Sequence, residues 1–287
     1  MHIGVTLPQT EIGGAVADLR TYAEGVEQLG YDHLVAYEHV VGADPAVYTD
    51  WSGPYDIDST FHEPFVLLGY LAGITKLELA PAVIILPQRQ TALVAKQAAE
   101  VDLLAEGRFR LGIGLGWNEV EYEALGQDFS TRGRRMDEQV ALLRRYWTER
   151  SITFEGEFDR VTGAGIAPLP LQRPIPLWFG GGSKPAFRRM GRLADGWFPM
   201  MTPGPQLDEA MATISASAEA AGRDPQTIGM EGRITWTGDL DQVKREAEQW
   251  RARNATHVSI NTMGSQLGPI AAHVDVLATV ASALALR

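Results

Sequence analysis

Apolar positions change their spacing in a regular alternation along the chain. Residues 3–8 form a mostly apolar run of the length of a buried strand. An amphipathic helix is predicted next, because apolar side chains recur at spacings of three and four at Val16, Leu19, Ala23 and Val26. The same alternation continues to the end of the chain. Further strands are predicted at 31–37, 77–86, 108–114, 176–179, 196–199, 228–236 and 256–261, with helical segments between them.

Eight strand–helix units in succession predict a parallel sheet, because a helix is the usual crossover between parallel strands. Eight such units are typical of an α/β fold, the (β/α)8 or TIM barrel, which has about 250 residues. The chain has 287 residues, and the excess fits insertions near 40–62 and 148–175. The second insertion includes a predicted hairpin around Gly156. We expect a single barrel domain over 1–287, with an open doubly wound sheet as the alternative.

The composition of the chain argues against several kinds of site and several classes of protein. The chain has no cysteine, which excludes disulfides, thiolate metal sites and a cysteine nucleophile. Its formal net charge of -11 is unfavourable for binding to nucleic acid or to an anionic membrane. No apolar run is long enough to span a bilayer, and the first positive charge, Arg20, comes too late for a signal peptide. We therefore expect a cytoplasmic protein that acts on a small-molecule substrate.

In a barrel the catalytic and ligand-binding residues lie at the C-terminal ends of the strands. In this chain the residues at the predicted strand ends are mostly apolar, aromatic or amide-bearing. Such a rim suits a flat organic cofactor better than a metal ion, and no metal site is predicted. Of the six histidines, only His39 directly follows a predicted strand, next to Glu38. A lone histidine is often structural, but at this position an imidazole can exchange a proton near neutral pH. His39 is therefore the first candidate catalytic residue.

Two glycine-rich stretches also follow predicted strands. Residues 112–116 do not match a dinucleotide fingerprint, so their glycines indicate either close approach to a planar ring or a tight turn out of the barrel. Residues 180–183 precede a helix that carries Lys184 and Arg188. Backbone N–H groups at such a helix start bind phosphate well, and many barrels bind phosphate in this region. A plain turn is the alternative for this stretch.

Several longer motifs together resemble one protein family. They are Ile3-Gly4-Val5-Thr6-Leu7-Pro8, Leu86-Pro87-Gln88-Arg89, Leu104-Ala105-Glu106-Gly107-Arg108-Phe109, Gly114-Leu115-Gly116-Trp117 and Trp178-Phe179-Gly180-Gly181. The chain resembles the luciferase-like monooxygenase superfamily, and within it the oxidoreductases that use the deazaflavin coenzyme F420. The resemblance covers nearly the whole chain and implies a (β/α)8 barrel with insertions that forms a homodimer.

The resemblance also implies a deazaflavin or flavin stacked in the barrel mouth, with its phosphate near the glycines that follow the fifth strand. Deazaflavin members commonly carry a non-proline cis peptide behind the ring, at the place that Ala82-Val83 occupies here. On this basis His39 and Glu38 are expected to be catalytic. The expected cofactor contacts are Ala82, Val83, Ile85, Gly114, Trp117, Asn118, Gly180, Gly181, Gly182 and Ser183.

Two residues depart from the deazaflavin pattern. Glu38 stands where those members usually have Asp before the histidine, and a Glu-His pair is also found in flavin-using relatives. Trp117 stands where the sugar-phosphate dehydrogenases of the family have a catalytic Glu, so Glu119 or Glu121 would have to replace it. The first departure keeps FMN open as the cofactor, and the second argues against a sugar-phosphate substrate.

Three functions remain open from the sequence. The first is an F420-dependent oxidoreductase that transfers a hydride to or from a small organic substrate, in a site shaped by Trp117 and the aromatic loop 48–61. The second is an FMN-dependent monooxygenase that uses O2 and receives reduced flavin from a partner reductase. The third is a barrel that binds a ligand without catalysis.

Overall fold

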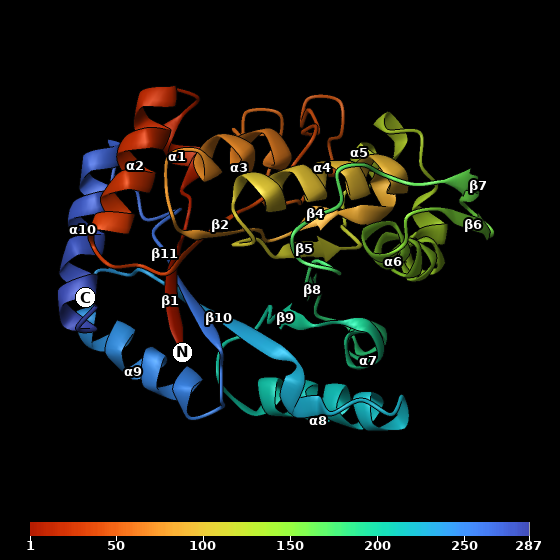
Figure 1. Ribbon diagram of the computed structural model, residues 1–287. Coiled ribbons are helices and arrows are strands. Elements are labelled where there is room, and N and C mark those ends of the chain that lie inside the picture. Colours follow the sequence, from red (N-terminus) through yellow and green to blue (C-terminus); the bar gives the residue numbers. More distant parts are fainter. Residues whose placement is uncertain (287) are drawn as a thin grey trace.

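Parallel strands form a barrel at the centre of the computed structural model, which describes residues 1–286 (Figure 1). The sheet order is β3-β2-β1-β11-β10-β9-β8-β5-β4, and a bridge from Leu79 of β3 to Phe109, just before β5, closes the barrel. The predicted (β/α)8 fold is confirmed, and the open sheet is wrong. The strands are β1 (His2–Thr6), β2 (His33–Ala36), β3 (Glu78–Pro81), β4 (Ile84–Ile85), β5 (Leu111–Gly114), β8 (Leu177–Gly180), β9 (Gly196–Phe198), β10 (Gly229–Thr235) and β11 (His257–Asn261).

The third barrel strand is interrupted, although the apolar run 77–86 predicts a continuous one. It consists of β3 and the two-residue β4, which pairs with β5. Ala82 and Val83 lie between the two halves and are joined by a cis peptide bond, at the place where the family resemblance implies one. The Ala82 N–H donates to the Ala36 carbonyl at 2.8 Å, so the interruption remains attached to β2.

Helices lie around the outside of the barrel with their apolar faces on the strands (Figure 1). The long ones are α2 (Val16–Gln28), α3 (Pro64–Ala72), α4 (Thr91–Leu104), α6 (Arg132–Thr148), α7 (Lys184–Leu193), α8 (Pro205–Ala220), α9 (Leu240–Arg251) and α10 (Ile270–Ala283). The shorter ones are α1 (Gln9–Ile12), α5 (Glu119–Ala124) and the 3-10 turns η1 (Leu86–Gln88), η2 (Phe129–Thr131) and η3 (Pro225–Thr227). None of the helices within residues 1–286 combines the length and the hydropathy that crossing a membrane requires.

Two helices, α5 and α6, share the region between β5 and the hairpin. Gly126 has a φ of 67°, a left-handed conformation that ends α5. Asp128 then caps the turn η2 through the Ser130 N–H. The short helix α5 carries Glu121, whose carboxylate contacts the residues just beyond the end of β2.

Two insertions interrupt the strand–helix alternation. Residues 38–63 contain neither helix nor strand and are folded on themselves, because the Ile57 N–H donates to the Ala43 carbonyl and the Trp51 indole to the Tyr55 carbonyl. The second insertion contains the predicted hairpin, made of the antiparallel strands β6 (Ile152–Glu155) and β7 (Arg160–Ala164). Glu138 of α6 accepts three backbone N–H groups of the hairpin turn and fixes it to the barrel.

The end of the barrel where the strands begin contains a buried ionic cluster. His33 of β2 and Arg110, just before β5, both contact Glu231 of β10, each at 2.9 Å. Arg110 also lies over the Trp178 ring, with its guanidinium carbon 4.2 Å from the ring centre. Burial alone raises the pKa of Glu231, but the His33 imidazole and the Arg110 guanidinium outweigh it and hold that pKa well below its usual range. The candidate functional site lies at the opposite end of the barrel, where the strands finish.

Candidate active site

His39 lies three residues beyond the end of β2, at the rim of the barrel. Its side chain is 13% exposed. The rings of Phe61, Tyr55 and Trp117 surround the imidazole, with centres 4.9 to 5.5 Å from its own. His39 therefore meets the aromatic loop and Trp117, as the sequence-based proposal for a substrate site requires.

Glu121 of α5 is the polar partner of His39, with its Oε1 atom 3.2 Å from Nδ1. The same oxygen accepts the Val40 N–H at 2.7 Å and the Val41 N–H at 3.4 Å. The Glu121 side chain is only 2% exposed. The sequence suggested Glu121 only as a replacement carboxylate, and it carries no sign of this pairing because 82 residues separate the two side chains.

Glu38 points to a different set of partners from its neighbour. Its carboxylate accepts from Arg89 at 2.8 Å, and Arg89 also contacts Glu63 at 3.2 Å. Burial raises the pKa of Glu38 to about 7, although the Arg89 charge works against the shift. Its second oxygen, Oε2, is buried and has no hydrogen-bond partner within residues 1–286. Glu38 thus remains a predicted catalytic residue, and its observed contacts are with Arg89 rather than with His39.

Three of the expected cofactor contacts lie together around Val83. A Cβ atom at Gly114 would lie 2.6 Å from one Val83 methyl, and a Cβ at Gly180 would lie 3.0 Å from the other. These two glycines therefore leave room for the Val83 side chain between β5 and β8. The glycines of 112–116 predicted that a planar ring could approach the backbone closely. At Gly114 the group that approaches is the Val83 side chain, from the interruption between β3 and β4.

The residues after β5 make a tight turn and begin α5. Gly116 has a φ of 68°, which favours glycine, and it packs against Ile85. Trp117 follows and is 43% exposed, with its ring against His39. Asn118 is buried and caps α5, because its side-chain oxygen accepts the Val120 and Glu121 N–H groups. The cap fixes the start of the helix that carries Glu121.

The glycine turn between β8 and α7 has free backbone donors. Ser183 caps α7 through the Ala186 N–H. The N–H groups of Gly182, Ser183 and Lys184 donate to no protein group in the described part of the chain. Of the basic residues on α7, Arg189 and Arg192 are paired with Asp137, whereas Lys184 and Arg188 have no ion-pair partner within residues 1–286. This arrangement can accept a phosphate group.

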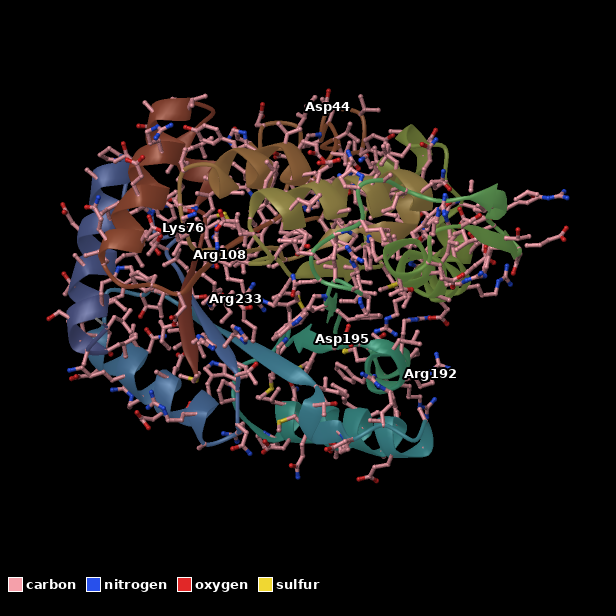
Figure 2. All side chains as sticks on the ribbon, in the orientation of Figure 1. Asp44, Lys76, Arg108, Arg192, Asp195 and Arg233 are labelled. Atoms are coloured by element: carbon pink, nitrogen blue, oxygen red, sulfur yellow. The ribbon has the colours of Figure 1, made fainter. Side chains whose placement is uncertain are left out.

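Arg233 of β10 places a positive charge at the mouth of the barrel. This residue is not among those that the sequence predicted for the site. Its guanidinium donates to the Tyr37 hydroxyl at 3.2 Å, a contact that joins β10 to the end of β2 across the strands between them. Figure 2 shows Arg233 near the centre of the molecule, beside β10. A cavity of about 260 Å³ opens next to it, lined in part by Met200, Met201 and Thr235. A guanidinium in this place favours an anionic group on a bound molecule.

A larger cavity, of about 1010 Å³, lies between the first insertion and α5. Its walls include the aromatic side chains of Tyr48, Trp51, Trp117 and Phe129. Trp117 forms part of this wall and also contacts His39, so one side chain links the cavity to the candidate catalytic residue. No group of three or more metal-ligating side chains comes together among residues 1–286.

A model of the luciferase-like monooxygenases matches residues 1–274. The chain belongs to this family. An uncharacterised protein of Mycobacterium tuberculosis strain H37Rv is 33% identical over 219 residues, which are 73% of this chain and 75% of that protein. The family's members are oxidoreductases and monooxygenases, so this chain is assigned to an enzyme family with redox chemistry.

The characterised relatives of the chain differ in their cofactors. An FMNH2-dependent dimethylsulfone monooxygenase of Pseudomonas putida is 31% identical over 176 residues, 58% of this chain and 48% of that protein. An F420-dependent glucose-6-phosphate dehydrogenase of Nakamurella multipartita is 28% identical over 246 residues, 80% of this chain and 71% of that protein. The solved structure of an F420-dependent secondary alcohol dehydrogenase has a TM-score of 0.80 at 16% identity, covering 99% of this chain and 98% of its own, which shows the shared fold. The family thus includes both deazaflavin and flavin enzymes.

Proposed function

We propose that the protein is an oxidoreductase that transfers a hydride between the deazaflavin coenzyme F420 and a small organic substrate. The observation that carries the proposal is the His39–Glu121 pair at the rim. One imidazole nitrogen faces a buried carboxylate, and the other makes no hydrogen bond within residues 1–286. Oxidation of a hydroxyl or amine carbon by hydride removal also releases a proton, and an imidazole is the side chain best suited to take it near neutral pH.

The choice of the deazaflavin over FMN rests on the extent of the match to each kind of relative. The F420-dependent relative matches 80% of this chain, and the FMNH2-dependent one matches 58%. The turn at Gly180 to Ser183 fits the phosphate that both coenzymes carry, because the N–H groups of Gly182, Ser183 and Lys184 donate to no group within residues 1–286 and α7 directs its positive end to them. The residues present therefore fit a phosphate-bearing redox coenzyme.

When bound, the coenzyme supplies the carbon that accepts or returns the hydride. The chain's own residues would accept or return the proton that accompanies the hydride. In the direction of oxidation, the substrate loses a hydride from carbon and a proton from its hydroxyl or amine, and His39 accepts that proton. In the direction of reduction, His39 returns it. Trp117 and the aromatic loop hold water away from the imidazole, which strengthens its polar interactions.

Titration of the purified protein with F420 and, separately, with FMN tests the proposal, with coenzyme fluorescence as the signal. We expect tight binding of F420 and much weaker binding of FMN. A preference for FMN would contradict the deazaflavin assignment and favour an oxygen-using monooxygenase that receives reduced flavin from a reductase. Tight F420 binding with no hydride transfer to or from any member of an alcohol, aldehyde and amine panel would favour a ligand-binding barrel instead.

Charge reversal at the start of α7 is expected to weaken coenzyme binding. An acidic chain must concentrate its cations where an anion binds, and Lys184 and Arg188 are exposed cations beside the free N–H groups. Lys184→Glu and Arg188→Glu should each raise the dissociation constant by about tenfold, the equivalent of about 1.4 kcal/mol. Added salt should weaken binding to the unmodified protein more than to either variant.

Lys76→Glu is the matched control, because it changes the net charge equally at the other end of the barrel. Lys76 is exposed and precedes β3, and within residues 1–286 its amine contacts only the exposed Glu106. We expect this variant to bind the coenzyme as the unmodified protein does. Equal loss in all three variants would show a general effect of net charge, and no loss at Lys184 and Arg188 would place the phosphate elsewhere.

A further inference from the structure

Glu121 is a buried carboxylate whose contacts converge on one segment of the chain. Its Oε1 atom receives the N–H groups of Val40 and Val41 and faces Nδ1 of His39. All three partners are consecutive residues, and the carboxylate comes from α5, 82 residues further along the chain from His39. A carboxylate with 2% exposure is rare in a protein interior unless hydrogen bonds compensate for its burial, as they do here.

The geometry fixes the direction of the hydrogen bond to His39. Two backbone N–H groups donate to Oε1, as they do to the oxygen of an ionised carboxylate, and this geometry assigns Oε1 the role of acceptor toward His39 as well. The nitrogen that faces it at 3.2 Å must then donate, so Nδ1 carries the proton in the neutral imidazole. In that tautomer Nε2 has the free electron pair.

The hydrogen bond to Glu121 selects one of the two orientations of the ring. Phe61, Tyr55 and Trp117 contact the imidazole from different directions. Rotation of the ring by a half turn would place a carbon against the Glu121 oxygen and would lose the hydrogen bond. The carboxylate therefore selects one orientation and one neutral tautomer, and the aromatic rings enclose the imidazole at that place.

We propose that Glu121 is a positioning residue for the reaction, which holds the proton of His39 on Nδ1 and leaves Nε2 to exchange a proton with the substrate. The statement about the tautomer rests on geometry alone, whereas the statement about the substrate rests on the proposed function. The pairing is the same device by which a buried carboxylate orients an imidazole base in other enzymes.

The tautomer can be measured without a substrate, by two-bond nitrogen–proton correlation NMR of protein labelled with nitrogen-15 histidine. The spectrum is recorded at mildly alkaline pH, where ordinary histidines are neutral. His39→Asn identifies the His39 signals by their disappearance. We expect the pattern of a proton on Nδ1. A proton on Nε2 in the unmodified protein would overturn the proposal at once.

Variants of Glu121 then separate positioning from mere packing. Glu121→Leu removes the acceptor, and His39 is expected to change to the Nε2–H form that free imidazole side chains prefer in water. Glu121→Gln keeps an acceptor oxygen and is expected to keep the Nδ1–H form. Glu123→Gln, an exposed neighbour on α5, is the matched control and should change nothing. An unchanged tautomer in Glu121→Leu would overturn the proposal, and if that variant does not fold, the spectrum of the unmodified protein still decides.

The kinetic consequence is measured once a substrate has been found with F420. Glu121→Leu should lower kcat by about 100-fold, within the range that proton transfer by a positioned group contributes, with little change in KM for the coenzyme. Glu121→Gln should recover a large part of the loss. An Nδ1–H tautomer together with full activity in Glu121→Leu would overturn the role in the reaction. An Nδ1–H tautomer together with full activity in His39→Asn would instead refute the proposed function and leave the positioning intact.

Discussion

Replacement of His39 by Asn is expected to lower turnover by about 100- to 10,000-fold, the range that a positioned general acid or base contributes. The reason is chemical rather than structural. The Asn amide can still donate to Glu121 and thus preserve the hydrogen bond that joins the rim to α5, but it cannot accept a proton from a substrate near neutral pH. The binding of the coenzyme should stay within a few-fold of normal, because its phosphate lies at the start of α7 in our proposal.

Steady-state kinetics and coenzyme titration check this result together. Thermal unfolding of His39→Asn is the control for its folding and should match that of the unmodified protein. Glu38→Gln gives a second comparison at the neighbouring residue, whose side chain contacts Arg89 and not the imidazole. If His39→Asn keeps normal turnover, another group moves the proton and the proposed role of His39 is wrong.

Replacement of Glu231 by Leu is expected to destabilise the fold by about 3–5 kcal/mol, the usual effect of removing one partner from a buried ion pair. His33 and Arg110 both contact this carboxylate at 2.9 Å, and the three side chains are between 1% and 6% exposed. Without Glu231, three polar groups, the His33 imidazole, the Arg110 guanidinium and the Ser259 hydroxyl, lose a buried partner that water cannot replace. Since whole domains are stable by only about 5–15 kcal/mol, the effect should be obvious in denaturant unfolding.

Two further variants show whether the charge is the cause. Glu78 also contacts Arg110 but is 33% exposed, so Glu78→Gln should cost about 1 kcal/mol or less. The double variant Glu231→Leu with Arg110→Met should lose less stability than the sum of the single variants, because no guanidinium is left unpaired. Additive losses would show that the carboxylate and the guanidinium act independently.

The same cluster predicts how stability changes in acid. The pKa of Glu231 is lowered from its ordinary value of 4.5 in the folded protein, so below that pH the unfolded chain binds a proton that the folded one does not. The contribution of Glu231 to stability is therefore complete above about pH 4.5 and declines as the pH falls further. The difference in unfolding free energy between the unmodified protein and Glu231→Gln should shrink over that acid range.

The local pattern of the sequence was sufficient to predict the barrel. Strand and helix periods depend on neighbours a few residues apart, so the eight units and the hairpin could be recognised without any distant contact. The position and form of the break in the run 77–86 could not be recognised in this way, since the residues on both sides of Pro81 are mostly apolar and suit a strand. It depends on Gly114 and Gly180, which give Val83 its space and lie on two other strands.

The sequence by itself also determined that His39 lies at the end of the barrel where the strands finish, because position after a strand is a local property. Only the tertiary structure decided what His39 and Glu38 contact. Adjacent residues in an extended chain point to opposite sides, and the partners of these two come from different strand–helix units, Glu121 from α5 and Arg89 from the segment before α4. The burial that raises the pKa of Glu38 and the carboxylate that orients His39 exist only once those units are packed together.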